Sequence, residues 1–206
     1  MKKIHFIFTL TAVLTFTFYG MAHAEKNFAS NKNQNPKEMI AAAEKALAKD
    51  PTDSKAFYNR GTAYFQLGDY DAAIRDLSAA IAIEPKAPDV YYNRGLSYRQ
   101  KHLFDQAIAD YTAAIALYPK QPSYFINRCN AFIAKGEYDN AISDCSAAIA
   151  LQPNDPRSYF LRGLAQMFKG DLPGAVVDAD HALKIDPEYA DAKKLKQEAV
   201  ETSKPS

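Results

Sequence analysis

The stretch FYNRGTAYFQLGDYDAAIRDLSAAIAIEP (57–85) decides the fold, because its pattern recurs at a constant displacement of 34 residues. The further copies are YYNRGLSYRQKHLFDQAIADYTAAIALYP (91–119), FINRCNAFIAKGEYDNAISDCSAAIALQP (125–153) and YFLRGLAQMFKGDLPGAVVDADHALKIDP (159–187). Self-similarity at a fixed period of about 20 to 50 residues is typical of solenoids, in which each unit stacks on its neighbours. The sequence therefore predicts a repeat protein.

Each unit has the pattern of two antiparallel helices. The units begin at Ser54, Pro88, Pro122 and Pro156. Proline is favoured as the first residue of a helix, and glycine is favoured just after its end. Small residues in the eighth and twentieth columns of the unit let the two helices approach closely. Aromatic residues form a stripe that we expect to fill the space between helices; they are Phe57, Tyr64, Tyr91, Tyr98, Phe125, Phe132 and Tyr159.

This pattern resembles the tetratricopeptide repeat, a helix-turn-helix motif with aromatic, small, alanine and proline residues at these offsets. The resemblance implies an all-α superhelical solenoid of antiparallel helix pairs. Its four repeats would span 54–87, 88–121, 122–155 and 156–189. Residues 37–53 match only the second helix of a unit, so the solenoid is expected to start on a half repeat. Residues 190–206 are expected to form a capping helix and tail.

Arginine fills the seventh column of every unit, where the tetratricopeptide family usually has an apolar residue. An aspartate follows sixteen residues later on the facing helix, where its carboxylate could accept two hydrogen bonds from the guanidinium. The expected structural ion pairs are Arg60 with Asp76, Arg94 with Asp110, Arg128 with Asp144, and Arg162 with Asp178. The alternative is a row of arginines that captures an anionic ligand.

The two cysteines lie in the third unit. Cys129 and Cys145 occupy the eighth and twenty-fourth columns, on the two helices that the small residues bring together. In an oxidising compartment two such thiols should form a disulfide. The alternative is a pair of small buried thiols, because the same columns hold compact packing residues in other units.

In the tetratricopeptide family, ligands bind the concave face, which the first helix of each repeat forms. The resemblance places Asn59, Asn93 and Asn127 in one row on this face, and Leu161 interrupts the row in the fourth unit. An amide both donates and accepts hydrogen bonds, so such a row could hold the backbone of an extended peptide. The alternative is that these asparagines only cap or solvate a helix.

The other candidate peptide-binding residues lie beside this row, and they become more apolar toward the C-terminus. They are Lys55, Tyr58, Phe65, Tyr92, Arg99, Asn130, Phe160 and Met167, with Ile126, Ile133, Leu164 and Phe168 also apolar and Arg157 also basic. A contiguous exposed apolar patch usually marks a partner site. The carboxylate clamp of co-chaperone repeats is not expected here. Its Lys/Asn/Asn/Lys/Arg positions fall on Tyr58, Thr62, Asn93, Ser123 and Asn127, where only Asn93 matches.

Residues 1–24 have the pattern of an export signal. Two lysines precede the apolar run 4–19, and Ala22-His23-Ala24 has the small-x-small pattern of a cleavage site. A retained anchor is the alternative, although the run is near the lower length limit for spanning a bilayer. Residues 25–36 are polar and are expected to form a flexible leader. We therefore expect a soluble mature chain, without membrane insertion, in a bacterial periplasm or outside the cell.

Composition, charge and the motif content argue against several classes of function. The 206 residues include 25 Lys and Arg against 24 Asp and Glu, so nucleic-acid binding is not expected. After residue 24 the histidines are His102 and His181, and no HExxH, GxSxG or phosphate-binding glycine loop occurs. Neither catalysis nor a metal or cofactor is therefore expected. The sequence predicts an adaptor that binds extended peptide segments of envelope or secreted proteins. The alternative is a structural homo-oligomer that assembles through the apolar end of the groove.

Overall fold

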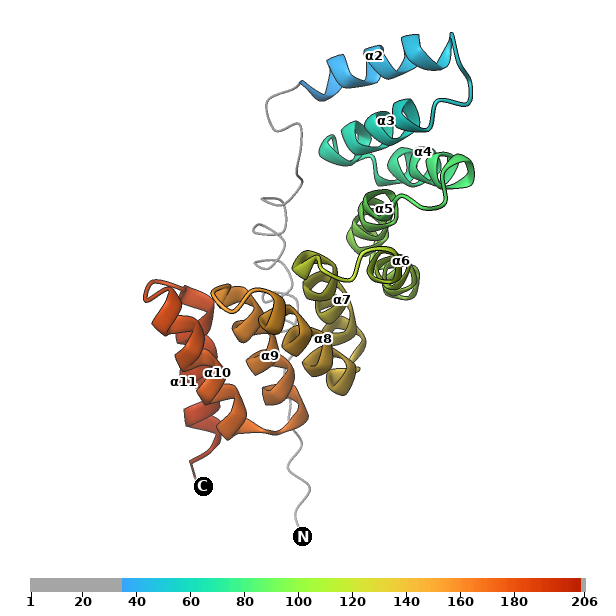
Figure 1. Ribbon diagram of the computed structural model, residues 1–206. Helices are drawn as coiled ribbons and strands as arrows, with labels where there is room; N and C mark the ends of the chain where they lie inside the picture. Colours follow the sequence, from blue (N-terminus) through green and yellow to red (C-terminus); the bar gives the residue numbers. More distant parts are fainter. Residues whose placement is uncertain (1–34, 205–206) are drawn as a thin grey trace. The chain divides into compact units, whose positions relative to one another are not determined.

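The computed structural model describes residues 35–204, and all regular structure in this range is helical (Figure 1). The expected signal sequence 1–24 and most of the expected leader 25–36 lie outside the described residues. The helices are α2 (Pro36–Leu47), α3 (Ser54–Gln66), α4 (Tyr70–Ile83), α5 (Pro88–Gln100), α6 (Phe104–Leu117), α7 (Pro122–Lys135), α8 (Tyr138–Leu151), α9 (Pro156–Lys169), α10 (Leu172–Ile185) and α11 (Ala190–Thr202).

Local chemistry sets the ends of these helices. Asp53 and Asp69 cap α3 and α4 by accepting hydrogen bonds from backbone nitrogens three residues later, at 2.9 and 3.0 Å. The first helices of the third and fourth units end at Gly136 and Gly170, which have the left-handed φ values of 78° and 95°. His102 takes this place in the second unit, with φ of 58°, at a mild steric cost.

Small residues allow the two helices of each unit to pack closely. A Cβ atom on Gly95 would lie 2.7 Å from Cε1 of Tyr111, and one on Gly61 would lie 2.9 Å from Cγ of Leu77. Gly61 and Gly95 on the first helices therefore each face a large side chain on the second helix of their unit. Gly163 faces Leu195 of α11 in the same way, at 3.0 Å from Cδ2.

Within residues 36–204, consecutive helices stack in one continuous series from α2 to α11 (Figure 1). The first helices α3, α5, α7 and α9 also contact one another in turn, so they line one common face. We call this surface the first-helix face. At the C-terminal end, α11 packs on α9 and α10 and buries Ala192, Leu195 and Ala199, as expected for a capping helix.

Candidate functional site

The arginine column and the aspartate column form the ion pairs that the spacing predicts. In each of the four units the guanidinium donates two hydrogen bonds of 2.6–2.9 Å to the carboxylate sixteen residues later. The four aspartates are only 2–7% exposed. Burial raises the pKa of Asp110, and the hydrogen bonds and charge of Arg94 oppose that rise. Since each charge is compensated within its unit, this row offers little to an external anion.

Three of these arginines also bond to the preceding repeat. Arg94 donates to the hydroxyl of Ser78 at 3.0 Å, and the matching bonds run from Arg128 to Thr112 at 2.9 Å and from Arg162 to Ser146 at 3.2 Å. The ion pair of one unit is thereby tied to the second helix of the unit before it.

The aromatic stripe packs at the edge of the core. Its members are half-buried, Phe57 and Tyr64 pack against the buried cluster of the first unit, and most members also lie beside an arginine. The guanidinium of Arg94 is 5.9 and 5.8 Å from the ring centroids of Tyr91 and Tyr98, a distance at which cations attract aromatic faces.

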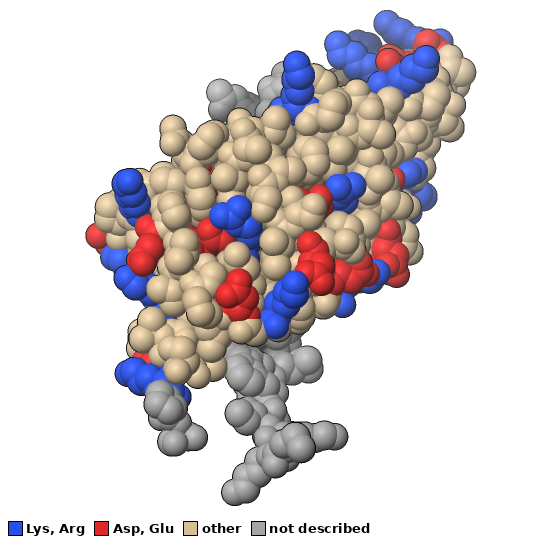
Figure 2. All heavy atoms as spheres, turned by 60° about the horizontal axis from the view of Figure 1, so that its bottom comes forward, with Lys and Arg blue, Asp and Glu red and all other residues tan. Residues whose placement is uncertain are grey.

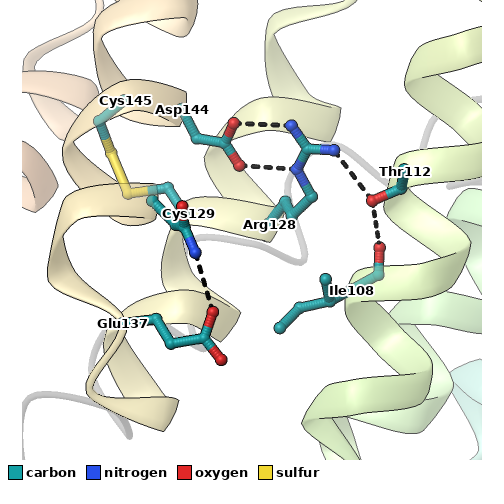
Figure 3. A network of polar contacts seen from close by, with 8 residues as sticks. Ile108, Thr112, Arg128, Cys129, Glu137, Asp144 and Cys145 are labelled. Carbon is teal, nitrogen blue, oxygen red and sulfur yellow. Dashed lines mark hydrogen bonds and ion pairs between the residues drawn. A yellow bond between two sulfur atoms is a disulfide. The ribbon is translucent and has the colours of Figure 1, made fainter.

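Cys129 and Cys145 form a disulfide that joins α7 to α8 next to the Arg128–Asp144 pair (Figure 3). Their Cα atoms are 5.8 Å apart. The bridge occupies the two columns that hold Gly95 and Tyr111 in the second unit. In the third unit a covalent bond therefore takes the place of a small–large packing contact.

The asparagine row is engaged inside the solenoid, which differs from the expected free amides. Asn93 Nδ2 donates to the hydroxyl of Tyr58 at 3.1 Å, and Asn127 Nδ2 donates to the hydroxyl of Tyr92 at 2.9 Å. Each bond connects consecutive repeats. In the fourth unit Leu161 stands in place of the asparagine. The third unit has the apolar Ile126 in the column of Tyr58 and Tyr92, so no hydroxyl is present there to accept a bond. The donors of two asparagines are thus already used, whereas the half-buried Asn59 forms no bond of this kind within residues 35–204.

The remaining candidate residues differ in how accessible they are. Lys55 is exposed, whereas Asn130, Tyr58 and Phe65 are half-buried. Phe160 and Met167 are buried at 3% and 5% exposure, and the ring of Phe160 meets that of Tyr189 edge-on. Leu164 and Ile133 are buried as well. The C-terminal end of the first-helix face is therefore apolar as expected, but in this structure its large side chains are not an exposed patch.

Arg99 and Arg157 have no carboxylate partner among the described residues, in contrast to the arginines of the ion pairs. Arg99 is 5% exposed, and its Nε is buried without a hydrogen-bond partner. Four further side-chain atoms are also buried without a hydrogen-bond partner: Nε and Nη2 of Arg157, the hydroxyl oxygen of Tyr111 and Oδ1 of Asn127. We call Tyr92, Arg99, Tyr111, Asn127 and Arg157 the arginine–tyrosine cluster. Sequence reasoning singled out four of these residues but missed Tyr111, which reaches the cluster from a second helix.

An exposed set of ion pairs also escaped sequence reasoning. Lys101 pairs with Asp71, Lys135 with Asp105 and Lys169 with Asp139, each across a repeat boundary. The signal was a lysine at the end of the first helix and an aspartate thirty residues earlier, repeated three times. Exposed pairs of this kind contribute about 0–1 kcal/mol each, so they adjust repeat contacts more than they hold the fold.

The described residues show neither a metal-binding cluster nor a membrane span. Between residues 35 and 204 no three His, Cys, Asp or Glu side chains are grouped so that they could hold a metal ion. No helix in that range has the length and hydropathy needed to cross a bilayer. Figure 2 shows basic and acidic side chains interspersed on the face in view, with no large area of one sign.

Family models of the tetratricopeptide repeat match the chain at residues 42–75, 61–102, 88–121 and 129–170, which together span more than half of it. The chain belongs to the tetratricopeptide repeat family. The period, the helix pairs and the capping helix described above are those of a tetratricopeptide superhelix. Proteins of this family are in general protein-interaction scaffolds rather than enzymes.

Solved structures of tetratricopeptide proteins resemble this chain over most of its length. A crystal structure of MamA is 26% identical, with a TM-score of 0.70, and the match covers 73% of this chain and 88% of MamA. YrrB, described as a tetratricopeptide protein with an unusual peptide-binding site, is 19% identical with a TM-score of 0.73 and 89% coverage of both chains, which shows the fold alone. A comparison with curated proteins gave no match.

A third structure was solved with a peptide. It is the first tetratricopeptide domain of Spaghetti (RPAP3) bound to the HSP90 peptide SRMEEVD. This domain is 26% identical to the present chain, with a TM-score of 0.55, and the match covers 56% of this chain and 91% of the domain.

Proposed function

We propose that this tetratricopeptide chain is an exported adaptor that binds extended peptide segments of envelope or secreted proteins along its first-helix face. The observation that carries the proposal is the set of unpaired polar atoms in the arginine–tyrosine cluster. A folded chain seldom buries such groups without a partner, and a bound peptide would supply one. The Spaghetti domain supports this assignment, because it is a relative of the same fold that holds a peptide.

Two further features support the exported location. The N-terminal residues 1–24 have the composition of a secretory signal, and the Cys129–Cys145 disulfide would persist in an oxidising compartment. In this compartment the adaptor would meet other exported chains in extended form.

A site-specific photocrosslinking experiment tests the proposal. A photoreactive amino acid replaces Asn130, which is half-buried on the first-helix face, and a matched variant carries it at Ala116, which is exposed on a second helix. Both variants are expressed in cells, irradiated, and analysed by mass spectrometry of the crosslinked segments. We expect peptides of another exported protein to be linked at position 130 and not at position 116.

Two outcomes would contradict the proposal. Equal crosslinking at both positions would show non-specific contact with the whole surface. Crosslinks at position 130 to this chain alone, together with a mass above that of the monomer in light scattering, would favour the homo-oligomer instead.

A further inference from the structure

The arginine–tyrosine cluster collects nearly all of the unpaired buried polar atoms in the described part of the chain. Five of the six side-chain atoms of this kind belong to Arg99, Tyr111, Asn127 and Arg157. The remaining one is Oε2 of Glu198, in the capping helix. Because buried polar groups in native proteins are nearly always hydrogen-bonded, such a concentration in one place calls for a specific cause.

Several observations place these side chains near one another. The rings of Tyr92 and Tyr111 have centroids 5.9 Å apart, and the hydroxyl of Tyr92 accepts the bond from Asn127 at 2.9 Å. Burial raises the pKa of Tyr111, and the positive charges of Arg99 and Arg157 oppose this rise. Both guanidinium groups therefore act on the same phenol, although they come from α5 and α9.

The two arginines bring positive charge to the cluster without a salt bridge to any carboxylate of the described residues. Burial lowers the pKa of Arg157 and the charge of Arg99 acts in the same direction, whereas Tyr92 and the carboxylate of Asp155 oppose this lowering. Asp155 and Asp89 make their side-chain hydrogen bonds elsewhere: Asp155 accepts from the hydroxyl of Ser158 at 2.7 Å, and Asp89 accepts from the hydroxyl of Tyr124 at 2.7 Å. Two guanidinium groups that have buried nitrogens and no salt-bridge partner among the described residues are unfavourable, so a ligand of negative charge would be bound more strongly than a neutral one.

We propose that the arginine–tyrosine cluster binds the side-chain carboxylate of an acidic residue within an extended peptide. The guanidinium groups of Arg99 and Arg157 supply donors for the two carboxylate oxygens. Oδ1 of Asn127 is an acceptor and suits a backbone N–H of the same peptide. This inference rests on the proposed function and names the side chain that the site selects.

The position of the cluster favours an internal acidic residue over a C-terminal carboxylate. Its residues lie on α5, α6, α7 and α9, with α3 on one side and α11 on the other side of the series. A peptide that continues past the cluster in both directions can use the first-helix face on either side, including the half-buried Tyr58 and Phe65 of α3. A chain end at the cluster would leave one half of this face unused.

A peptide-library selection tests the inference on the full chain. The library consists of random decapeptides with blocked termini, so that only side chains provide carboxylates, and a second library has free C-termini. Selection is carried out on the native protein and on an Arg99→Gln/Arg157→Gln variant. The charge-matched control is Lys86→Gln/Lys120→Gln, which removes two exposed lysines from the repeat loops. Circular dichroism and thermal melting verify that all three proteins are folded.

We expect Asp or Glu to be enriched at one position of the blocked peptides selected by the native protein and by the control. The glutamine variant should lose this enrichment and bind the selected peptides roughly ten- to hundredfold more weakly, as expected for charge-assisted hydrogen bonds. Peptides selected without an acidic preference would overturn the inference and leave the proposed function standing. Selection from the free-terminus library alone would overturn the internal assignment, and no selection from either library would contradict the proposed function as well.

Discussion

At the scale of single residues, the same side-chain type serves different purposes in different columns. The seventh-column arginines are neutralised by aspartates of their own units, whereas Arg99 and Arg157 have no such partner among the described residues. The asparagines show the same division, because their Nδ2 donors hold neighbouring repeats together while Oδ1 of Asn127 has no partner there. The residue type alone therefore does not reveal a side chain's role. The role depends on the side chain's position in the repeat and on which residue stands at the position that it contacts.

The Arg94–Asp110 pair gives a prediction at this scale. Arg94→Met removes the partner of a carboxylate that is only 4% exposed, and breaking a buried pair in this way costs about 3–5 kcal/mol. Arg94→Ala should cost more, since methionine keeps the volume between Tyr91 and Tyr98. Urea unfolding at pH 7 measures both losses, and Lys86→Met, at an exposed position, serves as the control.

The pH dependence of this loss follows from the pKa of Asp110. Burial already raises that pKa, and Arg94→Met removes the opposing charge, so the folded variant binds a proton more readily than the unfolded chain. The raised pKa stabilises the folded state at low pH, and this contribution disappears as the pH rises through the folded pKa. We therefore expect Arg94→Met to be less destabilising at pH 4 than at pH 7. An equal loss at both values would show that Asp110 remains charged.

At the scale of helix pairs, the third unit shows how a repeat can exchange one kind of contact for another. The eighth and twenty-fourth columns hold Gly and Leu in the first unit, Gly and Tyr in the second, and the disulfide in the third. All three solutions fill the same space between the two helices. The disulfide therefore adds a covalent restraint at a place where the first two units have a packing contact.

Replacement of the disulfide by the pair from the first unit tests this interpretation. Cys129→Gly/Cys145→Leu should fold with the same helix content and lose up to about 3 kcal/mol, the value for a closed loop of this length. Adding a reductant should destabilise the native protein and leave the variant unchanged in urea unfolding. A reductant effect on the variant, or none on the native protein, would contradict a structural role for the bridge.

At the scale of the whole described chain, much of the fold could be predicted from the sequence because the repeat shows each packing relationship four times. The ion pairs and the helix ends followed from column positions, and the capping helix followed from the apolar face of the segment after the last repeat. The site could be predicted less well, because the position of a residue in the repeat does not show whether its hydrogen-bond donor already bonds to a neighbouring repeat. The bond from Asn93 to Tyr58 spans 35 residues and depends on the superhelical turn between repeats, which the period alone does not specify.

Because each helix contacts mainly its neighbours, a destabilising substitution at one end of the solenoid should destabilise only the nearby helices. Leu195 of α11 is fully buried against Gly163, so Leu195→Ala should destabilise the last repeat by about 2–5 kcal/mol. In a solenoid this loss should appear as faster amide hydrogen exchange in α9–α11, with α3–α6 unchanged. Val200→Ala, at a position 39% exposed on the same helix, is the matched control. Uniformly faster exchange along the chain would indicate a single cooperative unit instead.

The disulfide also has a mechanical consequence for a chain that is held at both ends. Under tension the repeats can peel away one after another, because each is fastened only to its neighbours. The segment between Cys129 and Cys145 cannot straighten while its bridge is intact, although all the rest can. The fully stretched oxidised chain is therefore shorter than the reduced one by about 50 Å, at roughly 3.5 Å per residue. The redox state of this one bond thus changes the greatest length that the extended chain can reach.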